Sequence, residues 1–114
     1  MSHPMSKLLS IAIFPAALVA AGSVMAADSA AIEKKAKEVC AACHGPDGNT
    51  PTGPDFPKLA GQHYDYLLHS LKSYKSGARK NPIMAPQAQS LSLEEMEGLA
   101  AYYSHQSGTL VTKR

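Results

Sequence analysis

The chain has 114 residues, of which 45 % are hydrophobic and 18 % are charged. This length holds at most one small domain. A formal net charge of +2, with no run of five basic residues, excludes the usual basic type of nucleic-acid-binding protein. Five Tyr, two Phe and no Trp are a thin aromatic supply for a core, so we expect a group other than side chains to fill part of the interior.

The N-terminal segment has the pattern of a secretory signal peptide, residues 1–26. One lysine precedes an uncharged apolar stretch over residues 8–21, which is shorter than the ~20 residues that a membrane helix needs. Small residues lead to an expected cleavage after Ala26, with Ala27 fitting nearly as well. This predicts a domain over 27–114 in the periplasm, where disulfides form. The alternative is an uncleaved N-terminal anchor.

Three helices are predicted, over residues 30–42, 62–76 and 92–106. Residues 45–57 and 79–89 are rich in Gly and Pro and are expected to be loops. No segment alternates with period two, and the tail after Ser107 is expected to be frayed. The expected caps are Ser29 for the first helix, Gly77 for the end of the second, and the pair Ser92 and Glu95 for the third. The expected apolar faces are Ile32, Ala36 and Val39 on the first helix, and Leu93, Met96, Leu99, Ala100 and Tyr103 on the third.

The segment Cys40-Ala41-Ala42-Cys43-His44 carries the chemistry. It is C-x-x-C-H, the attachment sequence of a c-type haem. Two thiols one helical turn apart can add to the two vinyl groups on one edge of a porphyrin, and the following His can ligate the iron. A thioredoxin-like redox pair would follow a strand, whereas this pair follows a predicted helix. A zinc site would need two more ligands, and no second pair of His or Cys lies at metal spacing.

The sixth iron ligand has two kinds of candidate, methionines and the remaining histidines. Met84 lies in the predicted loop between two prolines, which stiffen the loop and limit the freedom of the thioether. Met96 falls on the apolar face of the last helix and is interpreted as core. His63, His69 and His105 are interpreted as surface or half-buried side chains, with His69 the second choice if Met84 fails.

Together these pieces resemble a class I c-type cytochrome of the small bacterial periplasmic kind, similar to the single domains of tandem two-haem cytochromes. The resemblance covers residues 29–106 and rests on segments that occur in one order. These are the Cys40–Gly45 motif, Gly53-Pro54-Asp55-Phe56-Pro57-Lys58-Leu59-Ala60-Gly61-Gln62, Asn81-Pro82-Ile83-Met84, and Leu91-Ser92 to Tyr103. It implies an all-α cytochrome c fold, with three main helices and loops around one haem c bound covalently through Cys40 and Cys43.

The resemblance also implies individual roles. His44 and Met84 become the axial ligands, and the carbonyl of Pro54 is expected to accept the second ring N–H of His44. Ile32 and Ala36 are expected to cross the last helix at Leu99, Tyr102 and Tyr103. Tyr66, Arg79 and Asn81 are expected to reach the haem propionates or to bracket the methionine.

Two protein ligands on the iron leave no position for a substrate, which predicts a one-electron carrier and not an enzyme. The alternatives are an electron-transfer subunit of a periplasmic oxidoreductase, or a module that binds a small ligand at the haem. Partners are expected to be periplasmic or membrane-bound oxidases, reductases or dehydrogenases, without nucleic acid or stable membrane insertion, and the chain is expected to be a monomer. The lysines expected to flank the haem edge are Lys58, Lys72, Lys75 and Lys80.

Overall fold

Helices form the regular structure of the computed structural model, which describes residues 10–18 and 28–111. Within these residues there is no strand, and no helix is both long and apolar enough to cross a bilayer. The predicted signal peptide lies largely outside the described residues, so its cleavage stays a prediction. The elements in chain order are α1 (Ser29–Lys35), the π-helical η1 (Ala36–Cys40), α2 (Ala41–His44), α3 (Tyr64–Ser76), α4 (Met84–Gln89) and α5 (Leu93–Ser104).

The first predicted helix forms as one continuous run of α1, η1 and α2. Its N-cap is Asp28, whose carboxylate accepts a hydrogen bond from the backbone N–H of Ala30 at 3.1 Å. The predicted cap, Ser29, is therefore one residue late, because both residue types cap well and only the backbone conformation decides between them. The π turn of η1 holds more residues than an α turn, so it rotates Cys40 and the residues that follow relative to the face carrying Ile32.

The crossing of the first and last helices is confirmed, since α1 packs against α5. Gly98 allows the close approach: a Cβ at this position would lie 2.7 Å from the side chain of Ile32. One turn further along, the hydroxyl of Tyr103 donates to the carbonyl of Ala36 at 3.4 Å. The buried residues of this core are Ile32, Ala36, Leu67, Leu91, Met96, Leu99, Ala100 and Tyr103.

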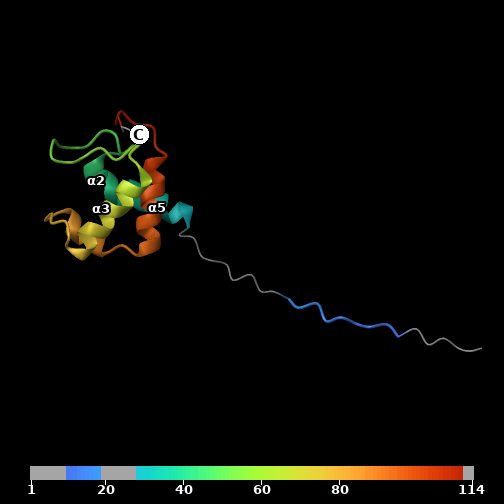
Figure 1. Ribbon diagram of the computed structural model, residues 1–114. Coiled ribbons are helices and arrows are strands. Elements are labelled where there is room, and N and C mark those ends of the chain that lie inside the picture. Colours follow the sequence, from blue (N-terminus) through green and yellow to red (C-terminus); the bar gives the residue numbers. More distant parts are fainter. Residues whose placement is uncertain (1–9, 19–27, 112–114) are drawn as a thin grey trace, which may run out of the picture.

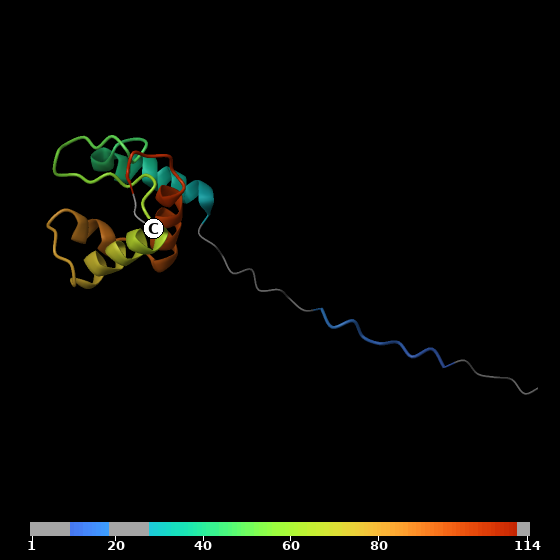
Figure 2. The same ribbon diagram turned by 45° about the horizontal axis from the view of Figure 1, so that its top comes forward.

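Helix α5 joins two arms of the molecule, because it packs against both α1 and α3. Figures 1 and 2 show two arms: α1, η1, α2 and the loop after them form one, and α3 with α4 forms the other. Gly77 ends α3 in a left-handed conformation, and Ser92 and Glu95 form the capping box of α5, both as predicted.

Further expectations about the fold are wrong. Val39, expected on the apolar face of the first helix, is 49 % exposed. Residues 79–89 were expected to be a loop, but they contain α4, which begins at Met84. Leu93 is 46 % exposed, because it starts the first turn of α5 on the side away from the core. The predicted frayed tail is ordered at Thr109, whose N–H donates to the side-chain oxygen of Asn49 at 2.9 Å, while residues 112–114 lie outside the described residues.

Candidate metal centre

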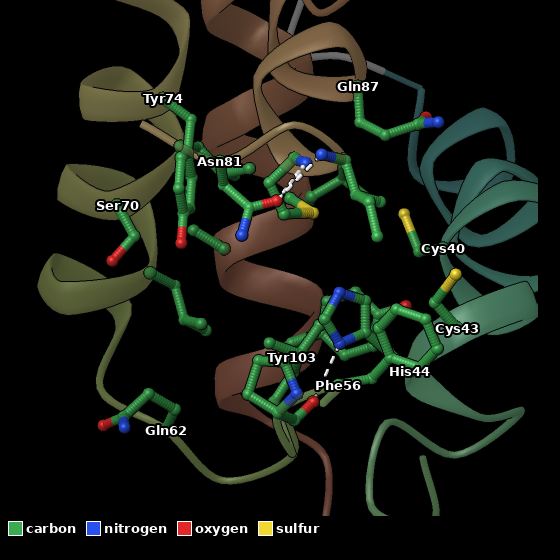
Figure 3. A pocket seen from close by; sticks show the side chains of 18 of the residues that line it. Cys40, Cys43, His44, Phe56, Gln62, Ser70, Tyr74, Asn81, Gln87 and Tyr103 are labelled. Carbon is green, nitrogen blue, oxygen red and sulfur yellow. Dashed lines mark hydrogen bonds between the residues drawn. The ribbon is translucent and has the colours of Figure 1, made fainter. Parts of the chain in front are cut away.

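A cavity of about 810 Å³ lies between the two arms. This volume is in the range of sites that enclose a small molecule or cofactor. Every helix contributes residues to its wall, α1 only through Lys35. Figure 3 shows side chains from both arms converging on the cavity. The lining includes Val39, Cys40, Cys43, His44, Phe56, Pro57, Leu67, Leu71, Met84, Leu99, Tyr103 and Leu110.

Cys40 and Cys43 lie on one side of this cavity, at the junction of η1 and α2. Both are free thiols. Figure 3 shows their sulfur atoms close to one another along the same edge. Burial raises the pKa of the Cys40 thiol, so this residue lacks the low pKa of a redox-active cysteine pair.

His44 ends α2 and is 6 % exposed. Its ring Nδ1–H donates to the carbonyl oxygen of Pro57 at 2.8 Å, because a carbonyl only accepts. In the neutral ring this contact leaves the lone pair on the other nitrogen, Nε2, which is the form that a metal ligand requires, and His44 lines the cavity. Gly45 follows with φ of +86°, which turns the chain away directly after His44.

The predicted partner of His44 is wrong by three residues: the carbonyl belongs to Pro57, not to Pro54. Pro54 is exposed and does not line the cavity. The reason lies in a turn over residues 53–56, which contains Pro54 and in which the N–H of Phe56 donates to the carbonyl of Gly53 at 3.3 Å. This turn carries the chain past Pro54 before it reaches the histidine.

Met84 is half-buried and lines the cavity from α4, on the arm that does not carry the Cys pair (Figure 2). Met96 is 4 % exposed in the core and does not line the cavity, in agreement with its interpretation as packing. His44 is the only histidine among the described residues that lines this cavity. His63, His69 and His105 are exposed.

Tyr66, Arg79 and Asn81 all line the cavity, as the resemblance implied. The guanidinium of Arg79 lies 4.7 Å from the ring centroid of Tyr74, which orients it by a cation–π contact. Its Nη1 also donates to the hydroxyl of Ser70 at 3.4 Å. This wall therefore presents a fixed cation and several hydrogen-bond donors to the cavity.

Sequence reasoning missed several polar residues of the wall: Gln62, Ser70, Tyr74 as a polar contact, and Gln87. Ser70 is one helical turn after Tyr66 and one before Tyr74, so the spacing of α3 carried the signal. Gln87 follows Met84 by three residues, a spacing that places two side chains on the same face of a helix. Because this segment is predicted as a loop, the spacing does not identify Gln87.

The remaining alternative from the sequence, a zinc site, needs four ligands. Among residues 10–18 and 28–111, no three His, Cys, Asp or Glu side chains gather in a way that could hold a metal ion. A metal at His44 must therefore bring further ligands with it, as the iron of a porphyrin does.

Residues 29–107 match the protein family described as Cytochrome c. The chain belongs to this family. It is 48 % identical over 82 residues to cytochrome c4 of Thiocapsa roseopersicina, a match that covers 72 % of this chain and 42 % of that protein. It is 46 % identical over 84 residues to cytochrome c-554(548) of Halomonas halodenitrificans, covering 71 % of this chain and 99 % of that protein.

The fold comparison agrees with the sequence comparison. The crystal structure of reduced recombinant cytochrome c4 from Pseudomonas stutzeri is similar to this chain with a TM-score of 0.64 and 41 % identity. The match covers 73 % of this chain and 47 % of that one. The chain thus spans about half or less of the length of the cytochromes c4 that it matches, and has the cytochrome c fold.

The covalent haem c of this family fits the residues of the cavity. Cys40 and Cys43 are free thiols one helical turn apart at its edge, so they would form the two thioethers. His44 offers an oriented lone pair, and Met84 a thioether from the other arm. The apolar lining supplies the dry surroundings that retain such a cofactor.

Proposed function

We propose that this protein is a one-electron carrier in the periplasm, with haem c attached through Cys40 and Cys43 and with His44 and Met84 as axial ligands. When bound, the haem supplies the redox chemistry by cycling its iron between Fe(III) and Fe(II). One observation carries the proposal: a single cavity receives the C-x-x-C-H segment from one arm and a methionine from the other. The predicted signal peptide supports the location.

Each proposed ligand is oriented by backbone groups. The carbonyl of Pro57 fixes the tautomer and direction of the His44 ring, and makes its Nε2 a better electron donor. Met84 lies at the start of α4, where the helix restricts its backbone. A thioether ligand favours Fe(II) and raises the reduction potential. Because His44 and Met84 would both ligate the iron and would leave no position for a substrate, we infer a carrier without an enzymatic site of its own.

The arm formed by α3 and α4 is the proposed approach for an acidic redox partner. From residue 62 to residue 93 the sequence has four basic residues and a single acidic one, Asp65. The ammonium group of Lys58 donates a hydrogen bond to the hydroxyl of Thr109, and that of Lys75 donates to the carbonyl of Leu91. Lys72 and Lys80 are exposed, and these two are proposed to steer the partner electrostatically.

The test uses the purified haem-loaded protein. We expect the weak absorption band at the red end of the Fe(III) spectrum, which reports a Met–Fe bond, and no ready binding of carbon monoxide by the Fe(II) form. We also expect fast electron exchange between the haem-loaded protein and a small one-electron redox reagent. Absence of the band together with tight binding of carbon monoxide would contradict the proposal and would favour a module that binds small ligands.

A further inference from the structure

One side chain, that of Asn81, organises the chain where it approaches Met84. Its Oδ1 accepts hydrogen bonds from the backbone N–H groups of Ile83 and Met84, both at 2.9 Å. Its carbonyl accepts a third, from the N–H of Ala85 at 3.1 Å. Pro82 has no N–H and has the backbone angle that a first helical turn requires.

These contacts account for every N–H at the beginning of the turn. A helix normally starts with four N–H groups that find no partner inside the helix. In the turn that leads into α4, Pro82 has no N–H and Asn81 accepts from the next three N–H groups, of which those of Met84 and Ala85 are the first two of α4. No other side chain is hydrogen-bonded to the backbone N–H groups of Ile83 and Met84 among the described residues. Without the Asn81 amide, two donors next to the Met84 side chain lose their acceptor.

The geometry points to Asn81 as the positioning residue that holds Met84 in place for the iron. This inference rests on the proposed function, since it takes Met84 as the axial ligand. Asn81 lines the cavity and is not an iron ligand itself. Its Oδ1 binds the N–H of Met84, so the ligand's own backbone is fixed by the contact. Figure 3 shows the amide oxygen turned to these backbone nitrogens and the amide nitrogen turned into the cavity.

The physical consequence is resistance of the Met84–iron bond to competing ligands. A competitor can enter only if the sulfur withdraws, and the sulfur belongs to the turn that Asn81 holds. Moving this turn breaks one or both of the capping hydrogen bonds. Loss of an N-cap side chain typically changes an equilibrium by a factor of about 2 to 30. The same factor is the largest change in the affinity of a competing ligand that the loss of the Asn81 side chain can cause.

The experiment measures the affinity of the haem-loaded Fe(III) protein for imidazole, followed by loss of the Met–Fe band. Imidazole and a thioether are both neutral, so the exchange leaves the charge at the iron unchanged. For Asn81→Ala we expect an affinity about 2- to 30-fold higher than in the parent protein. Asn81→Gly should show a smaller rise, because glycine is tolerated better at caps, and Asn81→Asp should stay within about 2-fold.

The matched control is Ser92→Ala, which removes the cap of α5. The Ser92 hydroxyl accepts from the N–H of Glu95 at 3.1 Å, and Ser92 does not line the cavity. This variant should lower the resistance to denaturant yet keep the imidazole affinity within about 2-fold of the parent. An Asn81 series that behaves like Ser92→Ala would overturn the inference and leave Asn81 as a helix cap only.

The same titration separates this inference from the proposed function. If Met84→Ala loses the Met–Fe band while Asn81→Ala has the parent's imidazole affinity, the ligand assignment stands and the role of Asn81 is refuted. If Met84→Ala keeps both the band and the parent's affinity, the ligand assignment is wrong, and the role given to Asn81 is wrong with it.

Discussion

The substitution Gly98→Ala probes the crossing of α1 and α5, on which the shape of the haem cavity depends. The new Cβ would lie 2.7 Å from the Cδ1 and Cγ1 atoms of Ile32. Carbon atoms in ordinary contact are ~3.5–4.0 Å apart, so the helices must separate by about 1 Å or Ile32 must leave its rotamer. Such overpacking costs about 1–3 kcal/mol, and the better helix propensity of Ala returns about 1 kcal/mol. We expect the free energy of unfolding to fall by on the order of 1 kcal/mol.

The assay is denaturant unfolding of the haem-loaded protein, followed by far-ultraviolet circular dichroism. Ile32→Val is the matched background, since it removes Cδ1, one of the two atoms at 2.7 Å. In that background Gly98→Ala should cost less than in the parent. A Gly98→Ala variant that is about 1 kcal/mol more stable than the parent, the full propensity gain, would show that the approach of the helices does not require glycine.

The remaining predictions concern haem attachment, an ion pair and the core. Cys40→Ser and Cys43→Ser, made singly, should each impair covalent haem retention on a denaturing gel; full retention by both would refute the attachment. Lys35, as the main cause, lowers the pKa of the Glu95 carboxyl below its ordinary 4.5. Glu95→Gln, which keeps the capping box, should therefore lose about 0.3–1 kcal/mol at pH 7. In a series of denaturant titrations the difference from the parent should shrink as the pH falls below 4.5 and vanish once the folded-state carboxyl is protonated. Met96→Leu should cost less than ~1.5 kcal/mol in the same assay and leave the iron spectrum unchanged; a changed spectrum would contradict its place in the core.

The parts of the fold that sequence predicted well are those set by neighbours along the chain. The cap at Ser92 and the stop at Gly77 need only residues within one turn, so local spacing was sufficient. Helix α4 was missed because it has six residues and contains Pro86. A proline in the first turn removes an N–H that has no partner there, so it is compatible with a helix even though it usually argues against one.

The features that sequence could not supply depend on residues far apart in the chain. Two prolines in one loop could each accept the His44 ring proton, and only the turn over residues 53–56 selects Pro57. The anchoring of Thr109 by Asn49 joins positions 60 residues apart, so the tail carries no local sign of order. The sequence places Asn81 three residues before Met84, but the hydrogen bonds of its side chain to the backbone are visible only in the structure.

The most direct test of the account is the reduction potential of Met84→Ala, measured beside the parent protein and Met96→Leu. We predict that the haem stays attached to Cys40 and Cys43, that the Met–Fe band disappears, and that the potential falls because the ligand that favours Fe(II) is gone. The reduced variant should also bind carbon monoxide. An unchanged potential and band in Met84→Ala, with both altered in Met96→Leu, would contradict the assignment of Met84 as the axial ligand.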